Sequence, residues 1–325
     1  MWLLVGLAAV VFVVASRAEL PAVGRALRHS HALWVLAGLG CAVAWAATFA
    51  VLHAVAQRAA GLTVGPRRQF FAAMVAGHFL NLVTKSGAMA GAMVVDGVAE
   101  RDGKPRGRVI GAYVLAAVAG QIAFGIVLAA AFVLIVADGR LTRAEAVAGI
   151  VFLVYLGVEV VVVVAAFGSQ RRTRALLATP RRWWARVRRQ SSVVADHSRA
   201  DELHAAMSLV RASPGRATAV LGVALLLEAI GVAMLWCALR AVNAPHTPKD
   251  ALVAYAVSVL FAIVGFLPGG LGFVEVSLGA MVVSLGGTVP TATAAVAVYR
   301  LLEFWLPVAA GAVALQLLRR RGALA

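Results

Sequence analysis

Six charged side chains lie inside long apolar stretches of this 325-residue sequence, where charge is costly. They are Lys85, Glu159, Glu228, Glu275, Arg300 and Glu303. A charged side chain at the centre of a bilayer costs at least about 2.5–3.5 kcal/mol on insertion scales. Because these charges include both signs and concentrate near two glycine-rich interruptions, they indicate a polar cavity within the apolar part of the protein.

Three of these charges are spaced so that they can pair. Arg300 and Glu303 are one helical turn apart on the same face, and Glu275 follows a proline–glycine interruption that can bring it to Arg300. One interpretation is a set of buried ion pairs that fixes helix packing. The other places Lys85 and Arg300 at the site of an anionic group, with Glu275 and Glu303 holding or releasing that group.

Five weaker candidates lie in other apolar runs. A single histidine in such a run, as at His53 and His78, is more often a packed side chain than a proton relay. Gln121 is the polar residue partway along its run. For Glu159 and Glu228, structural pairing and a role in a cavity are both open.

The composition explains why charge is scarce. Apolar residues make up 62% of the chain and charged residues 14%, against about 45–50% and about 25% in soluble proteins. We therefore predict an all-α polytopic membrane protein. Its 30 basic and 14 acidic residues give a net charge of +16, but the basic residues lie in short connections, where they report topology and contact with anionic headgroups rather than nucleic acid. Cys41 and Cys237 lie singly in apolar runs, so no redox or metal chemistry is expected.

Six runs are long enough to span a bilayer of about 30 Å. They are Met1–Leu20, which we expect to be retained, His31–Gln57, Val109–Ala137, Ala146–Gly168, Ala217–Leu239 and Ala292–Leu318.

Two further apolar segments are interrupted. The first, Phe70–Val95, carries polar residues and glycines in its middle: His78, Asn81, Thr84, Lys85, Ser86, Gly87 and Gly91. The second, Ala251–Val289, is broken by Pro268-Gly269-Gly270-Leu271-Gly272. Proline and glycine interrupt a helix, and irregular backbone at membrane depth is tolerated only inside protein or beside a cavity. Each segment is therefore predicted to be a hairpin of two half-helices, re-entering on the side from which it came.

The two interrupted segments indicate an inverted repeat. Residues 85–87 correspond to 268–270 at an offset of 183, and Gln121 corresponds to Glu303 at an offset of 182. Residues 1–167 form the first half, 168–216 a connection and 217–321 the second half. Because three spans separate the hairpins, the two halves have opposite orientations, as in many secondary transporters.

Arginines orient the chain. The connection 168–216 holds eleven arginines and three acidic residues, so it and the C-terminus are predicted to be cytoplasmic. The first hairpin then opens from inside and the second from outside. If Phe70–Val95 were instead a single span, the loops 16–30 and 58–69 would exchange sides.

Part of this connection has an amphipathic pattern. Trp183 and Trp184 stand among arginines, and Leu203, Met207 and Val210 recur at helical spacing. These features favour an interfacial helix on anionic lipid; a protein-docking face is the alternative.

Sequence motifs of common enzymes are absent. The chain has no Walker loop, HExxH, GxSxG or clustered Cys/His set. We therefore expect neither an enzyme nor a cofactor or metal.

Two motifs resemble those of the lysylphosphatidylglycerol synthetase membrane-region family. The first-half motif is Gly77-His78-Phe79-Leu80-Asn81-Leu82-Val83-Thr84-Lys85-Ser86-Gly87, continuing to Gly91. The second-half motif is Phe266-Leu267-Pro268-Gly269-Gly270-Leu271-Gly272-Phe273-Val274-Glu275, followed by Tyr299-Arg300-Leu301-Leu302-Glu303-Phe304-Trp305-Leu306-Pro307. Members that make the aminoacylated lipid carry a further soluble transferase domain, which this sequence does not include.

The resemblance implies a bacterial inner-membrane flippase for an anionic or aminoacylated phospholipid such as lysyl-phosphatidylglycerol. It implies a cavity at Asn81, Lys85, Glu275 and Arg300. Alternatives are a carrier for polyprenyl-phosphate-linked sugars, a non-transporting scaffold for an aminoacyl-lipid or glycosyl transferase partner, and a membrane-embedded transferase with Glu275 or Glu303 as base. A homodimer is also open.

Overall fold

The computed structural model describes residues 30–84, 89–101, 103–139, 143–168, 212–265 and 267–320, together with 202, 205 and 208–210. Every regular element in these ranges is a helix. The elements are α2 (Ala32–Ala59), α3 (Arg67–Thr84), α4 (Met89–Arg101), α5 (Arg106–Ala137), α6 (Arg143–Gly168), α9 (Pro214–Ala241), α10 (Pro248–Val264), η1 (Pro268–Gly270), α11 (Phe273–Ser284), α12 (Val289–Arg300), η2 (Leu301–Trp305) and α13 (Leu306–Arg320). The first predicted span, Met1–Leu20, lies outside these ranges.

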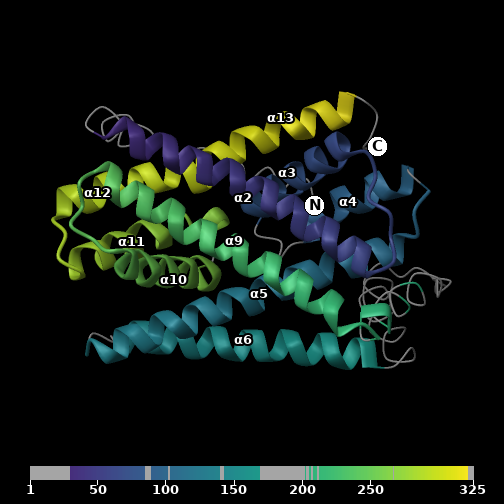
Figure 1. Ribbon diagram of the computed structural model, residues 1–325, viewed down its shortest axis with the longest axis horizontal. Helices are drawn as coiled ribbons and strands as arrows, with labels where there is room; N and C mark the ends of the chain where they lie inside the picture. The colour runs from purple at the N-terminus through teal and green to yellow at the C-terminus, as the bar shows by residue number, and fades with distance from the viewer. Residues whose placement is uncertain are drawn as a thin grey trace, which may run out of the picture.

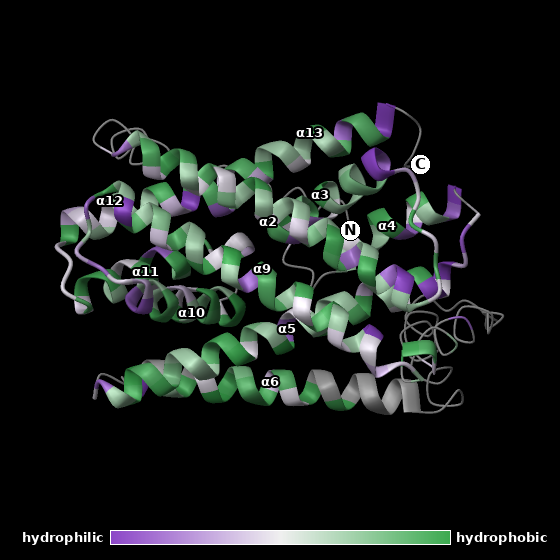
Figure 2. Ribbon diagram, viewed as in Figure 1, coloured by the Kyte–Doolittle hydropathy of each residue, from purple (hydrophilic) through white to green (hydrophobic). Residues whose placement is uncertain are grey.

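The other five predicted spans are confirmed as helices. They correspond to α2, α5, α6, α9 and the continuous run α12–η2–α13. The long helices lie roughly along the longest axis of the molecule, with α5 beside α6 and α2 beside α9 (Figure 1). Hydrophobic residues predominate along the helices, and hydrophilic residues gather toward the two ends of that axis (Figure 2). This distribution is that of an all-α polytopic membrane protein.

Both interrupted segments form helical hairpins, as predicted. Helix α3 packs against α4, and α10 packs against α11. The α10–α11 hairpin starts at the end of α5 where Lys249 forms an ion pair of 2.8 Å with Asp138. The α3–α4 hairpin ends at the opposite end of α5, where Arg106 pairs with Asp96. Because α5 is one continuous helix of 32 residues, about 48 Å long, the two hairpins open toward opposite ends of the protein.

The last turn of α3 in the first hairpin meets the break of the second hairpin inside the protein. Helix α3 contacts η1, the short turn at the break of the second hairpin. The single-span alternative for Phe70–Val95 is therefore wrong, and loop 58–69 lies at the same end as the connection between α4 and α5. Two interrupted helices that enter from opposite ends and touch are the arrangement that an inverted repeat predicts.

The apolar core is divided into two clusters, one around each hairpin. On α5 the division falls between Ala123 and Phe124, just after Gln121. On α9 it falls between Leu227 and Met234, at the position of Glu228. Gln121 and Glu228 therefore lie at the boundary between the two clusters.

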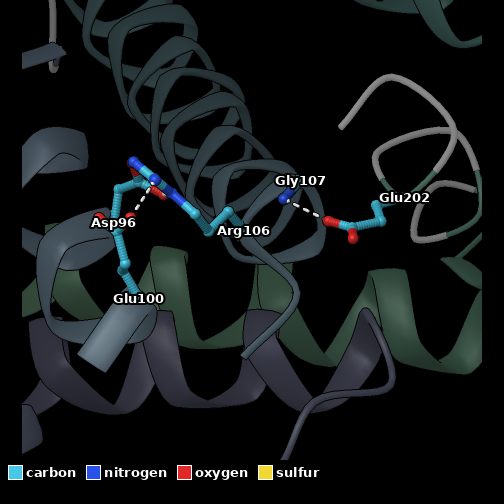
Figure 3. Close-up of polar contacts among 5 residues, drawn as sticks. All are labelled: Asp96, Glu100, Arg106, Gly107 and Glu202. Carbon is cyan, nitrogen blue, oxygen red and sulfur yellow. Dashed lines mark hydrogen bonds and ion pairs between the residues drawn. The ribbon is translucent and has the colours of Figure 1, made fainter. Parts of the chain in front are cut away.

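The basic connection approaches the mouth of the first hairpin. The Glu202 carboxylate accepts a hydrogen bond of 2.8 Å from the backbone N–H of Gly107, in the first turn of α5 (Figure 3). Negative charge is stabilising at a helix N-terminus. Val210 packs in the buried cluster around α3 and α4. Its side chain therefore does not contact lipid, contrary to the prediction of an interfacial helix. Trp183, Trp184, Leu203 and Met207 lie outside the described residues.

The opposite orientation of the hairpins predicts a labelling pattern. In a variant without Cys41 and Cys237, Lys249→Cys should react with a membrane-impermeant maleimide on intact cells, because Lys249 lies at the end predicted to be external. Arg101→Cys should react only after permeabilisation, because it lies at the end predicted to be cytoplasmic. Labelling of both positions from one side would contradict the hairpin arrangement, and reversal of both would contradict the predicted orientation alone.

Candidate functional site

An ion triad lies where the second hairpin meets α12. Arg300, the last residue of α12, is only 1% exposed. Its Nε lies 2.5 Å from Glu275 Oε1, and its Nη1 lies 3.1 Å from Glu303 Oε2. The predicted pairing of Arg300 with both carboxylates is thereby confirmed. If all three groups are ionised, the triad carries a net charge of −1, because two carboxylates face one guanidinium.

The contact with Glu275 is an ion pair without hydrogen-bond alignment. Arg300 Nε and Nη2 and both Glu275 oxygens are buried, and none has a hydrogen-bond partner among the described residues. Arg300 Nη1 also donates to the carbonyl of Gly269 at 3.3 Å, and the guanidinium lies 4.2 Å from the centre of the Phe304 ring. An anionic ligand of Arg300 would therefore meet the negative charge of two carboxylates that already face the guanidinium.

The break in the second hairpin brings the Gly269 carbonyl to Arg300. Helix α10 starts with a capping box, in which Thr247 and Asp250 exchange side chain–backbone hydrogen bonds. It ends at Val264, before Pro268. Gly269 has φ of +61°, a conformation that favours glycine. A Cβ at this position would collide with the Phe304 ring, so both the backbone conformation and the available space require glycine here.

Glu303 lies in a π-helical turn, η2, which joins α12 to α13. Single π turns are frequently found at functional sites. The Glu303 side chain is 34% exposed, whereas that of its partner Arg300 is 2% exposed. The carboxylate of Glu303 is therefore the accessible member of this pair.

Glu303 lines a cavity of about 470 Å³ at the meeting point of the two hairpins. The residues around it come from both halves of the chain: Asn81, Leu82, Gln121, Val151, Phe152, Tyr155, Ala262, Ile263, Val264, Gly269, Gly270 and Glu303. Gln121 Nε2 donates to Tyr155 Oη at 3.5 Å. Of the described residues that line the cavity, Glu303 is the one that carries charge. Gln121 and Glu303, matched by the predicted repeat, thus share this cavity.

Asn81 ties the first hairpin to α5. Its Nδ2 donates to Tyr113 Oη at 2.9 Å, and its Oδ1 accepts the backbone N–H of Gly91 at 2.7 Å. A Cβ built on Gly77 would lie 3.2 Å from the Gly91 Cα, so the two glycines let α3 and α4 approach closely. Asn81 borders the cavity, but both ends of its amide are already hydrogen-bonded; its role is to position the hairpin tip.

Two secondary candidates lie away from the cavity. His78 packs on Trp45 and Phe49, with ring centroids 4.9 and 5.1 Å away, and His53 stacks on Tyr113 at 4.7 Å. These contacts support the packing interpretation of both histidines.

Glu228 lies on α9 and accepts a hydrogen bond of 2.8 Å from Tyr255 Oη on α10.

Sequence reasoning missed Tyr113, Tyr155 and Tyr255. Each is a tyrosine inside a long apolar run. A buried tyrosine hydroxyl needs a hydrogen-bond partner, and this need could have identified the three residues as candidates for polar contacts.

The remaining predicted residues are placed as follows. Pro268, Gly269 and Gly270 form η1 at the tip of the second hairpin. Lys85 and Gly87 lie outside the described residues, directly after α3. Glu159 lies on α6, but its side chain is outside the described part of the structure.

A second polar cluster joins α4 to the start of α5, at the open end of the first hairpin. Arg106, at the start of α5, donates to Asp96 and to Glu100 of α4, the latter at 2.7 Å (Figure 3). Asp96 is the less exposed acidic partner, with its side chain 16% exposed against 61% for Glu100. Of the two pairs, the Asp96 pair is therefore the stronger link between α4 and α5, because exposed pairs are worth only about 0–1 kcal/mol.

These features define a class of protein: a helical membrane protein whose two broken hairpins enter from opposite ends and meet at a polar cavity. The chain belongs to the family of the lysylphosphatidylglycerol synthase TM region, whose family model matches residues 1–311. The resemblance seen in the two hairpin motifs is thereby confirmed. No curated protein matches the chain.

Proposed function

We propose that this protein moves a phospholipid with an aminoacylated headgroup between the leaflets of the bacterial inner membrane, without ATP hydrolysis of its own. The observation that carries the proposal is the cavity between the two hairpin tips, with the Glu303 carboxylate in its wall. Hairpins that open toward opposite ends give such a site a route to each leaflet when the two halves rock against one another.

The chemistry of the cavity suits an ammonium group. A carboxylate with its side chain 34% exposed, in a wall that also offers Gln121 and Tyr155, can accept a charge-assisted hydrogen bond from an aminoacyl amine. Lys85 is the next residue in the sequence after Thr84, the last residue of α3. We assign to it the binding of the lipid phosphate. Membership of the lysylphosphatidylglycerol synthase TM region family supports this choice of lipid.

The test is lipid exchange in reconstituted vesicles. Glu303→Gln should slow exchange of lysyl-phosphatidylglycerol by about tenfold to a hundredfold, because a hydrogen bond to a charged group is worth about 1.5–3 kcal/mol. Lys85→Ala should abolish it. Glu100→Gln, which changes an exposed carboxylate outside the cavity, should leave exchange unchanged.

Three results decide between this proposal and its alternatives. Wild-type exchange by folded Glu303→Gln and Lys85→Ala proteins would overturn the site. Co-purification of a polyprenyl-phosphate-linked sugar, detected by lipid mass spectrometry, would favour the carrier of such sugars. A variant lacking residues 181–189 that loses cellular function while keeping lipid exchange would favour the scaffold.

A further inference from the structure

An apolar groove runs between the two helices of the second hairpin. Its volume is about 530 Å³. It is lined by Val257 and Phe261 on α10, by Leu267, Leu271 and Gly272 in the break, and by Phe273, Val276, Ser277, Ala280, Met281 and Ser284 on α11. The two serine hydroxyls donate to backbone carbonyls of their own helix, Ser277 to Val274 at 3.3 Å and Ser284 to Met281 at 2.9 Å. The groove therefore offers an almost entirely apolar wall.

The groove opens on the outer surface of the hairpin. Val276, in its wall, is 72% exposed. Helix α11 is a half-helix of 12 residues that begins at the break inside the protein. In a bilayer, exposed apolar side chains on the outer face of such a half-helix would lie against lipid.

The groove and the polar cavity share one wall. Within the break, Gly269 and Gly270 line the cavity, while Leu267, Leu271 and Gly272 line the groove. The last turns of α10 divide in the same way, because Phe261 faces the groove and Ala262 faces the cavity. A single turn of backbone thus separates a polar space from an apolar one.

We propose that this groove holds one acyl chain of the phospholipid whose headgroup enters the polar cavity, with the 267–272 break between headgroup and chain. This inference rests on the proposed function and adds a second subsite to it. The occupant follows from the adjacency of the two spaces on either side of one turn of backbone, because a phospholipid is polar and charged at one end and apolar at the other. A bilayer is as apolar as the groove, so the groove gains its occupant through close packing and serves to position the lipid.

The experiment uses the full chain in vesicles that contain lysyl-phosphatidylglycerol with a photoreactive diazirine in one acyl chain. We expect the crosslinked peptide to include residues 273–284. Ala280→Trp should lower the yield of this peptide on the order of tenfold, which corresponds to about 1.4 kcal/mol of binding, because the indole ring takes the space of the acyl chain. Val283→Trp is the matched control, because Val283 lies on the same helix, is 39% exposed and does not line the groove; it should keep the wild-type yield. Thermal unfolding confirms that each variant is folded.

The results separate this proposal from its alternatives. Crosslinks that map to other helices, or an unchanged yield in Ala280→Trp, would overturn the acyl-chain subsite. Crosslinking of two copies of the chain through residues 273–284 would show a dimer interface instead and would also overturn it. The crosslinking yield does not depend on transport, so absence of exchange by the wild-type protein with normal labelling would contradict the proposed function and leave the groove assignment standing.

Discussion

Arg300→Met is expected to destabilise the protein by about 3–5 kcal/mol, which is the usual cost of removing one partner from a buried ion pair. The guanidinium is buried and faces Glu275 and Glu303, so its loss leaves two carboxylates close together without a countercharge. The effect is measured as a fall in the free energy of unfolding in detergent. Arg319→Met, at the exposed end of α13, is the control and should unfold like the wild type.

A neutral version of the triad separates stability from function. Combining Arg300→Met with Glu275→Leu and Glu303→Leu removes all three charges, and replacing a buried ion network by apolar residues of similar volume is often close to neutral in stability. We expect this triple variant to recover most of the lost stability but not the exchange of aminoacylated lipid. Wild-type stability of Arg300→Met alone would contradict the buried triad.

Gly91→Leu is expected to separate α3 from α4 at the tip of the first hairpin. A side chain at Gly91 would meet Asn81 Nδ2 at 2.5 Å, the Gly77 carbonyl at 3.0 Å and the Tyr113 hydroxyl. We expect a loss of about 1–3 kcal/mol from overpacking and about 1 kcal/mol for each Asn81 hydrogen bond that is broken. Lipid exchange should fall with stability, because Asn81 borders the cavity.

Gly222→Leu provides the matched control for this substitution. Gly222 is an exposed glycine of α9, and a Cβ there meets nothing within 4 Å. Leucine is the better helix former by somewhat less than about 1 kcal/mol, so this variant should be as stable as the wild type or slightly more so. Equal unfolding of the Gly91 and Gly222 variants would show that α3 and α4 do not cross at Gly91.

Much of the fold could be predicted from the sequence because its physical causes are local. The length of an apolar run decides by itself whether the run can span a bilayer. Pro268 and the glycines after it end a helix whatever surrounds them. The pairing of Arg300 with Glu303 is local in the same sense, since the two are one turn apart. Glu275 could be added because its charge also needed a partner at that depth.

The remaining contacts depend on how helices far apart in the sequence are rotated against each other. Asn81 belonged to the predicted site, but its two hydrogen bonds depend on how α4 and α5 face α3, which a hydropathy pattern does not specify. The pairing of Glu228 with Tyr255 likewise depends on the relative rotation of α9 and α10. The π turn at Leu301–Trp305 contains ordinary helix-forming residues and has no sequence signal.

That π turn also sets the rotation of everything after it. One residue more than a regular helix requires turns the following chain by about 100°, and this rotation puts Gly311 of α13 directly against Phe79 and the Val75 carbonyl of α3. Deleting a single residue between Leu301 and Trp305 would leave the composition and length of the last helix almost unchanged, yet would aim a different stripe of α13 at α3. The last helix of this chain is thus sensitive to insertions and deletions at a position where hydropathy alone would tolerate them.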